Sequence, residues 1–97
     1  MSAWKIAIRR LYELDGLATS SQITEHIKGR ANVYWPVERL RELGLIEPAT
    51  GHGRNQVCRI TPLGRAFVEG RAEVVKQPLQ FRTGRRPEVV RMVEGVK

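Results

Sequence analysis

The chain has 97 residues, which is enough for one compact domain but too short for two domains that enclose a substrate pocket. Its formal net charge is +7, from 17 basic and 10 acidic residues, and 13 of the basic residues are arginine. Arginine suits phosphates and guanine edges, so this composition favours an acidic partner such as a nucleic acid. Membranes, RNA and acidic proteins also attract basic chains, so charge alone leaves the partner open.

The cysteine count and the hydropathy of the sequence indicate the cellular compartment in which the protein is expected. The single cysteine, Cys58, cannot form an internal disulfide, and the N-terminal residues do not follow the pattern of a secretory signal. Uncharged stretches fall far short of the ~20 apolar residues that a membrane-spanning helix needs. We therefore expect a soluble protein of a reducing cytoplasm, either the bacterial cytoplasm or the nucleoid.

The first predicted element is an amphipathic helix over residues 3–14. Its apolar positions recur with helical spacing at Trp4, Ile8, Leu11 and Tyr12, while charged residues occupy the other side. The dipeptide Asp15-Gly16 ends this helix.

A capping signal predicts the start of a second helix. Thr19 and Gln22 have the spacing of a capping box, in which each side chain bonds the other residue's backbone amide. Ile23 and Ile27 then place an apolar side inward, and Gly29 can adopt positive φ just past the helix end.

A third helix is predicted from Val33, Val37, Leu40 and Leu43, which share one side. Its start is ambiguous because of Pro36, which removes a backbone donor. Either Asn32 caps the helix and its first turn is irregular, or the helix begins near Trp35 with Pro36 at its favoured first position.

The second half of the chain predicts a hairpin, a helix and a tail. Residues 45–48 and 56–60 read as two short strands joined by a glycine-rich connection. Thr61-Pro62 then begins a helix expected to run past Gly70 to about Val75. We expect one domain over residues 1–76, followed by a basic tail over residues 77–97 with a short terminal helix after Pro87.

Several segments in this order resemble winged helix-turn-helix regulators related to the MarR and PadR families. Residues 19–27 resemble the second helix of these proteins, and Val33-Tyr34 with Leu40, Leu43 and Gly44-Leu45-Ile46 resembles their recognition helix and its exit into the first wing strand. Residues 60–67, Ile-Thr-Pro-Leu-Gly-Arg-Ala-Phe, are similar to the junction after the wing. The resemblance covers roughly residues 3–75. It implies a mainly α fold with a small β-hairpin, in which a three-helix core is followed by a wing and a C-terminal helix.

The implied fold places a set of residues against double-stranded DNA. The N-terminal part of the third helix would reach base edges, the hairpin tip would contact phosphate or the minor groove, and the start of the second helix would offer hydroxyls to a phosphate. The residues at these places are Ser20, Ser21, Arg30, Asn32, Tyr34, Trp35, Arg39, His52, Arg54 and Asn55. In the tail, Arg82, Arg85 and Arg86 are candidates for phosphate contacts.

Each of these assignments has an alternative that needs no DNA. Trp35 could pack in the core, and Arg39 and Arg41 could pair with nearby glutamates on a solvated helix face. The hairpin tip could be an ordinary polar turn, and the hydroxyls of residues 19–21 are explained by capping. Residues 84–87, Gly-Arg-Arg-Pro, resemble an AT-hook, but Thr83 stands where that motif has an arginine.

Catalytic and metal chemistry receive little support from the sequence. His26 and His52 lie far apart, and no repeated ligand spacing or phosphate-binding glycine motif occurs. We expect Cys58 to face the inner side of the hairpin as a small apolar residue. The sequence therefore predicts a protein that is not an enzyme and that needs no cofactor and no metal.

The predicted function is sequence-selective binding of double-stranded DNA by a transcriptional regulator, as a repressor rather than an activator. Symmetric operators favour a homodimer, and the valines of the terminal segment with Met92 could form its surface or bind a protein partner. Two alternatives stay open. The chain could be a protein-interaction module for a polymerase, replication or packaging partner, or an architectural binder with little sequence preference.

Overall fold

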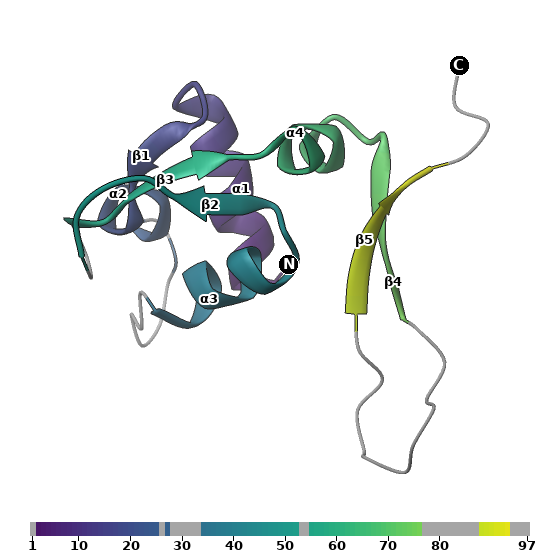
Figure 1. The fold of residues 1–97 in the computed structure, drawn as a ribbon, viewed down its shortest axis with the longest axis horizontal. Helices are drawn as coiled ribbons and strands as arrows, with labels where there is room; N and C mark the ends of the chain where they lie inside the picture. Colours follow the sequence, from purple (N-terminus) through teal and green to yellow (C-terminus); the bar gives the residue numbers. More distant parts are fainter. Residues whose placement is uncertain (1, 26, 28–33, 53–54, 77–87, 94–97) are drawn as a thin grey trace, which may run out of the picture.

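A computed structural model describes residues 2–25, 27, 34–52, 55–76 and 88–93 of the chain. These residues form four helices and two small antiparallel sheets (Figure 1). In chain order the elements are α1 (Ala3–Glu13), β1 (Leu17–Thr19), α2 (Ser20–Thr24), α3 (Tyr34–Glu42), β2 (Ile46–Pro48), β3 (Val57–Ile60), α4 (Pro62–Val68), β4 (Ala72–Lys76) and β5 (Glu88–Met92).

The first sheet has the strand order β1-β3-β2, so β3 lies in the middle. Leu17 pairs with Arg59 on one side of β3, and Ile46 pairs with Ile60 on the other. The second sheet consists of β4 and β5. Figure 1 shows α4 between this strand pair and the first sheet, with α2 and the β2–β3 connection at the opposite side of the molecule.

The core lies where α1, α2 and α3 meet the first sheet. Ile8 and Leu11 of α1, Ile23 of α2, Leu40 of α3 and Leu45 before β2 are all less than 2 % exposed. The apolar stripe predicted for the first helix is therefore confirmed as its buried side. Burying five such side chains contributes about 1.5–3 kcal/mol each, which makes this cluster the main stabilising feature of the domain.

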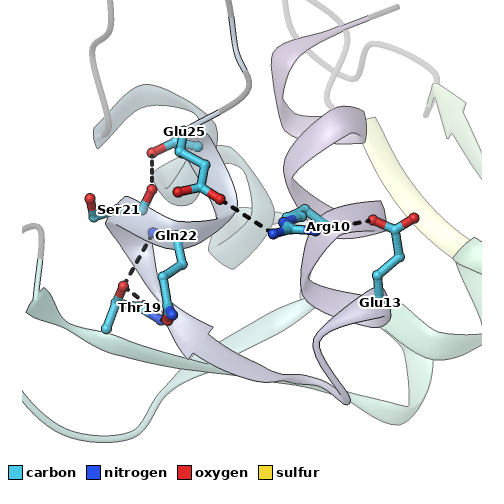
Figure 2. A network of polar contacts seen from close by, with 7 residues as sticks. Arg10, Glu13, Thr19, Ser21, Gln22 and Glu25 are labelled. Atoms are coloured by element: carbon cyan, nitrogen blue, oxygen red, sulfur yellow. Dashed lines mark hydrogen bonds and ion pairs between the residues drawn. The ribbon is translucent and has the colours of Figure 1, made fainter.

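The predicted capping box is present at the start of α2 (Figure 2). The Gln22 amide donates to Thr19 Oγ1 at 3.2 Å, and the Thr19 amide donates to Gln22 Oε1 at 2.8 Å. In the same view Arg10 of α1 lies between Glu13 and Glu25, with nitrogen–oxygen distances of 3.9 and 3.3 Å. The cap thus fixes the start of α2, and Arg10 links α1 to its end.

Pro36 lies within α3, which the structure describes from Tyr34 to Glu42. Asn32, the cap of one alternative for the start of this helix, lies outside the described residues. Pro36 itself is buried.

The C-terminal part corrects two predictions. The helix expected to reach about Val75 ends at Val68, and Gly70 follows it with φ +84°. Residues 72–76 are β4, and residues 88–92, where we expected a short terminal helix, are β5. The cause is the run of β-branched residues in both segments: they pair as Val74 with Val90 and Val75 with Val89, an arrangement that valine favours. The strand pair also spans the boundary expected at residue 76.

The first sheet has one strand that the sequence did not predict. Residues 46–48 and 57–60 confirm the predicted hairpin, but Leu17–Thr19 form β1 on the other side of β3. Three residues are too short to show an alternating pattern. The pairing depends on β3, which lies about forty positions along the chain.

Candidate nucleic-acid interface

The outer side of α3 faces a cleft of about 780 Å³ that separates it from the β4–β5 pair. The N-terminal end of α1 forms a further wall. Four residues of α3 and two at the ends of β4 and β5 carry most of its polar groups: Trp35, Glu38, Arg39, Glu42, Lys76 and Glu88. This cleft lies beside the helix predicted to read DNA.

Trp35 lies on the exposed side of α3, with 54 % of its surface accessible. The alternative that it packs in the core is therefore wrong. The core tryptophan is Trp4, which is 6 % exposed and has its ring centroid 5.5 Å from that of Phe67. The Trp35 side chain is therefore accessible on the surface of α3.

Arg39 is held by carboxylates on two elements. Its Nη1 lies 3.4 Å from Glu42 Oε2 one turn along α3, and its Nη2 donates to Glu88 Oε1 of β5. Only 23 % of its side chain is exposed. Arg41 pairs in the same way with Glu38 at 3.2 Å. Arg39 and Arg41 therefore both pair with nearby glutamates, as in the alternative interpretation that needs no DNA.

The charges that line the cleft are balanced. Lys5, Arg39 and Lys76 face three glutamates, two on α3 and one on β5. A surface with equal numbers of both signs gives little long-range attraction for phosphates. This side of α3 therefore suits specific contacts better than general attraction to DNA.

Ser20 is buried, so it is not available for the DNA contact that the sequence predicted. It is 3 % exposed, its hydroxyl lies 3.4 Å from the Gln56 carbonyl oxygen and 3.5 Å from Cys58 Sγ, and its amide donates to the same carbonyl. These contacts hold the start of α2 against β3 and leave no donor for a phosphate. Ser21 is exposed.

The described part of the β2–β3 connection contains two exposed candidate residues, His52 and Asn55. The Asn55 amide donates to the His52 carbonyl at 3.1 Å, and Gly51 has φ +82°. A Cβ at Gly51 would lie 2.6 Å from the Asn55 carbonyl oxygen, so glycine is required there. This backbone hydrogen bond places His52 and Asn55, both exposed, next to each other.

Tyr34 is the first described residue of α3. The remaining candidates lie outside the described residues and are Arg30, Asn32, Arg54, Arg82, Arg85 and Arg86.

The basic and acidic side chains are distributed unequally along the chain. The described residues include ten basic and nine acidic side chains, whereas the rest of the chain has seven basic and one acidic. Six of the seven net positive charges therefore belong to segments that flank the described elements. Ile27 and Tyr34 bound one of these segments, and His52 and Asn55 bound another.

Residues of the β4–β5 pair were missed by sequence reasoning. Lys76 and Glu88 lie opposite each other at the end of the pair and reach the same cleft as Trp35. Without the pairing of β4 with β5, nothing in the sequence places Glu88 near α3, because 49 positions separate it from Arg39.

The described residues offer little for other chemistries. Cys58 is 1 % exposed, as predicted, and its burial raises the pKa of the thiol, which makes it a poor nucleophile at neutral pH. No cluster of three potential metal ligands occurs within the described ranges. Among the helices of these ranges, none has the length and apolar content needed to cross a membrane.

Comparisons of the chain with protein-family models, with curated proteins and with solved structures find no match. The resemblance to winged-helix regulators therefore rests on the residue motifs.

Proposed function

We propose that the chain is a winged helix-turn-helix protein that binds double-stranded DNA selectively and acts as a transcriptional regulator, by repression rather than activation. The observation that carries the proposal is the element order α1-β1-α2-α3-β2-β3 with β3 between β1 and β2. In such a fold α3 is the reading helix and the β2–β3 connection is the wing.

The exposed side chains support this docking. An α-helix fits the major groove, where its N-terminal residues meet base edges. Trp35 is the second residue of α3 and is half exposed, so its ring can contact a thymine methyl group or stack on the backbone sugars. His52 and Asn55 at the tip of the wing can reach phosphate or the minor groove.

The distribution of charge supports the same orientation. The segment before α3 carries Lys28 and Arg30, and the segment within the wing carries Arg54. Three positive charges therefore lie next to the two elements that would approach DNA, while the described residues have a net charge of only +1. A phosphate contact from Arg54 would supply affinity, and Arg30 together with α3 would supply selectivity.

The proposed mechanism is occupancy. The protein would bind its site and exclude polymerase or another regulator, without catalysing a reaction. A homodimer would match a symmetric operator, and Met92, which is 47 % exposed at the end of β5, is available for such a contact.

A mobility-shift assay tests the proposal. The purified chain is titrated against the region upstream of its own gene and against a scrambled duplex of the same composition, each at two salt concentrations. We expect the upstream region to bind more tightly at both concentrations. Equal binding that weakens steeply with salt would indicate an architectural binder instead.

The balanced charge of the cleft favours a second candidate function, a winged-helix module that binds a protein. Two glutamates of α3, one glutamate of β5 and three basic residues surround the exposed Trp35, and a polar rim around an aromatic residue is typical of protein interfaces. Absence of binding to either duplex at low salt would favour this function over DNA binding.

A further inference from the structure

We propose that the β4–β5 pair competes with DNA for α3, because the Arg39–Glu88 ion pair holds it against the reading side of that helix. The inference rests on the proposed function. It adds a regulatory contact, the Arg39–Glu88 ion pair. Arg39 can contact a DNA base only after this ion pair has broken.

The geometry of Arg39 makes the competition direct. Arginine reads guanine by donating two parallel hydrogen bonds. Both terminal nitrogens of Arg39 already face carboxylates, Nη1 that of Glu42 and Nη2 that of Glu88. The side chain is 23 % exposed, so a base edge cannot approach the guanidinium without displacing at least one of these partners.

The position of the cleft shows that DNA bound to α3 would also have to displace the end of the β4–β5 pair. Trp35 and Glu38 of α3 lie on one wall, and Val74, Lys76 and Glu88 lie on the opposite wall. A duplex that places its major groove over Trp35 and Arg39 therefore meets the end of the β4–β5 pair. The acidic Glu88 is the residue that would repel its phosphates there.

The attachments of the β4–β5 pair suggest that it can leave α3 without unfolding. Val74 and Val90 pack against the hydrophobic core, and the Val93 amide donates to the Arg71 carbonyl at 2.9 Å. The strand pair packs mainly on α4, and Val74 also lines the cleft beside α3. Within the described residues, the polar link from α3 to this pair is Arg39–Glu88, so its loss releases the pair from α3 alone.

The test compares two neutralised glutamates on the same strand pair. Glu88→Gln removes the partner of Arg39, and Glu73→Gln removes an equal charge from β4, where Glu73 faces Arg91 and not α3. Affinity for the upstream duplex is measured for both variants by fluorescence anisotropy. We expect Glu88→Gln to bind about three- to tenfold more tightly than the unaltered chain, and Glu73→Gln to change affinity less than about twofold.

Two further measurements separate release of Arg39 from a general charge effect. With Arg39→Ala in place, Glu88→Gln should give no more gain than Glu73→Gln, because no guanidinium remains to be released. Hydrogen exchange in the free protein should stay unchanged at the amides of α1 and of the β4–β5 pair in Glu88→Gln, because the pair leaves α3 without unfolding. Exchange that rises across the whole chain would show general destabilisation and would overturn the inference.

The outcomes distinguish the two proposals. If the unaltered chain binds DNA and Glu88→Gln binds no more tightly than Glu73→Gln, the competition is wrong and the proposed function stands. If the unaltered chain binds weakly and only Glu88→Gln binds well, both are supported. If no variant binds any duplex at low salt, both fail.

Discussion

At the scale of single residues, Gly64 shows how closely α4 packs against the turn before β2. A Cβ built at this position would collide with the Leu45 carbonyl oxygen and would lie 2.8 Å from Ile60 Cγ1. Leu45 is completely buried and its carbonyl accepts a hydrogen bond from the Thr61 amide. The backbone on that side therefore has little freedom to retreat.

Gly64→Ala tests this packing, because helix propensity alone would predict the opposite sign. In an open helix the change would stabilise by up to about 1 kcal/mol. We expect it to destabilise the fold by about 1–3 kcal/mol, because the methyl group overpacks a fixed backbone. Urea unfolding followed by circular dichroism measures the effect, and a variant as stable as the original chain would contradict the packing.

The buried thiol of Cys58 predicts a dependence on pH. Burial is the main cause that raises its pKa in the folded chain, while the contact with Ser20 acts in the opposite direction. The folded state thus prefers the neutral thiol, so its contribution to stability is complete below the unfolded pKa of about 8.5 and is lost as the pH rises through the higher folded value.

The measurement is alkylation of Cys58 by iodoacetamide at pH 8. We expect the folded chain to react far more slowly than the chain in urea, because the reactive thiolate is scarce and covered. Similar rates in both conditions would mean that the thiol is accessible.

At the scale of elements, Thr61 joins α4 to the turn after α3. Its hydroxyl accepts a hydrogen bond from the Gly64 amide at 3.0 Å and donates one to the Gly44 carbonyl at 2.6 Å. One side chain therefore caps a helix and fixes the exit from α3. The position of α3 relative to the sheet depends in part on this residue.

Thr61→Ala should reduce the free energy of unfolding by about 0.5–2 kcal/mol, the usual effect of losing an N-cap. Thr61→Ser keeps the hydroxyl and serves as the matched variant, with stability expected close to that of the original chain. Thermal melts of the two variants show whether the hydroxyl at position 61 stabilises the fold. If serine is no better than alanine, the hydroxyl is not the stabilising group.

The elements that the sequence predicted well are those with local chemical signals. Thr19 with Gln22 and Thr61 with Pro62 marked the starts of α2 and α4 correctly, because capping involves residues three positions apart. β1 and the β4–β5 pair were missed because each depends on a partner strand distant in the chain. Residues 72–75 continue an apolar pattern that is compatible with a helix, and only pairing with residues 88–92 makes them a strand.

The candidate site was predicted less completely than the fold. The exposure of Trp35 could not be decided from sequence, because it lies off the apolar side of its helix, whereas large aromatic side chains dominate small cores. The pairing of Arg39 with Glu42 was foreseeable from their spacing on one helix, whereas Glu88 enters only through the β4–β5 pair. The burial of Ser20 follows from β1 and β3, which bring Gln56 and Cys58 against it.

At the scale of the whole molecule, affinity and selectivity are expected to come from different segments. Arg30 precedes the proposed reading helix, and Arg54 belongs to the proposed wing. Arg30→Ala should cost about 1–3 kcal/mol on the specific site and little on random duplex, because it removes a base contact. Arg54→Ala should weaken both duplexes alike and reduce the salt slope by about 1.

Arg65→Ala is the control for loss of charge, because Arg65 is exposed on α4, away from α3 and the wing. Binding of all three variants is measured by anisotropy at several salt concentrations. If the Arg30 and Arg54 variants both behave like the control, the proposed orientation on DNA is wrong.

Selective DNA binding is the central claim, and enrichment from a random pool of duplexes tests it most directly. After several rounds of selection, the dissociation constant is measured at physiological salt for the enriched duplex and for a shuffled duplex of the same composition. We predict one recurring sequence that binds at least about a thousandfold more tightly than its shuffled form. Recovery of unrelated sequences, or equal dissociation constants for the two duplexes, would contradict the claim.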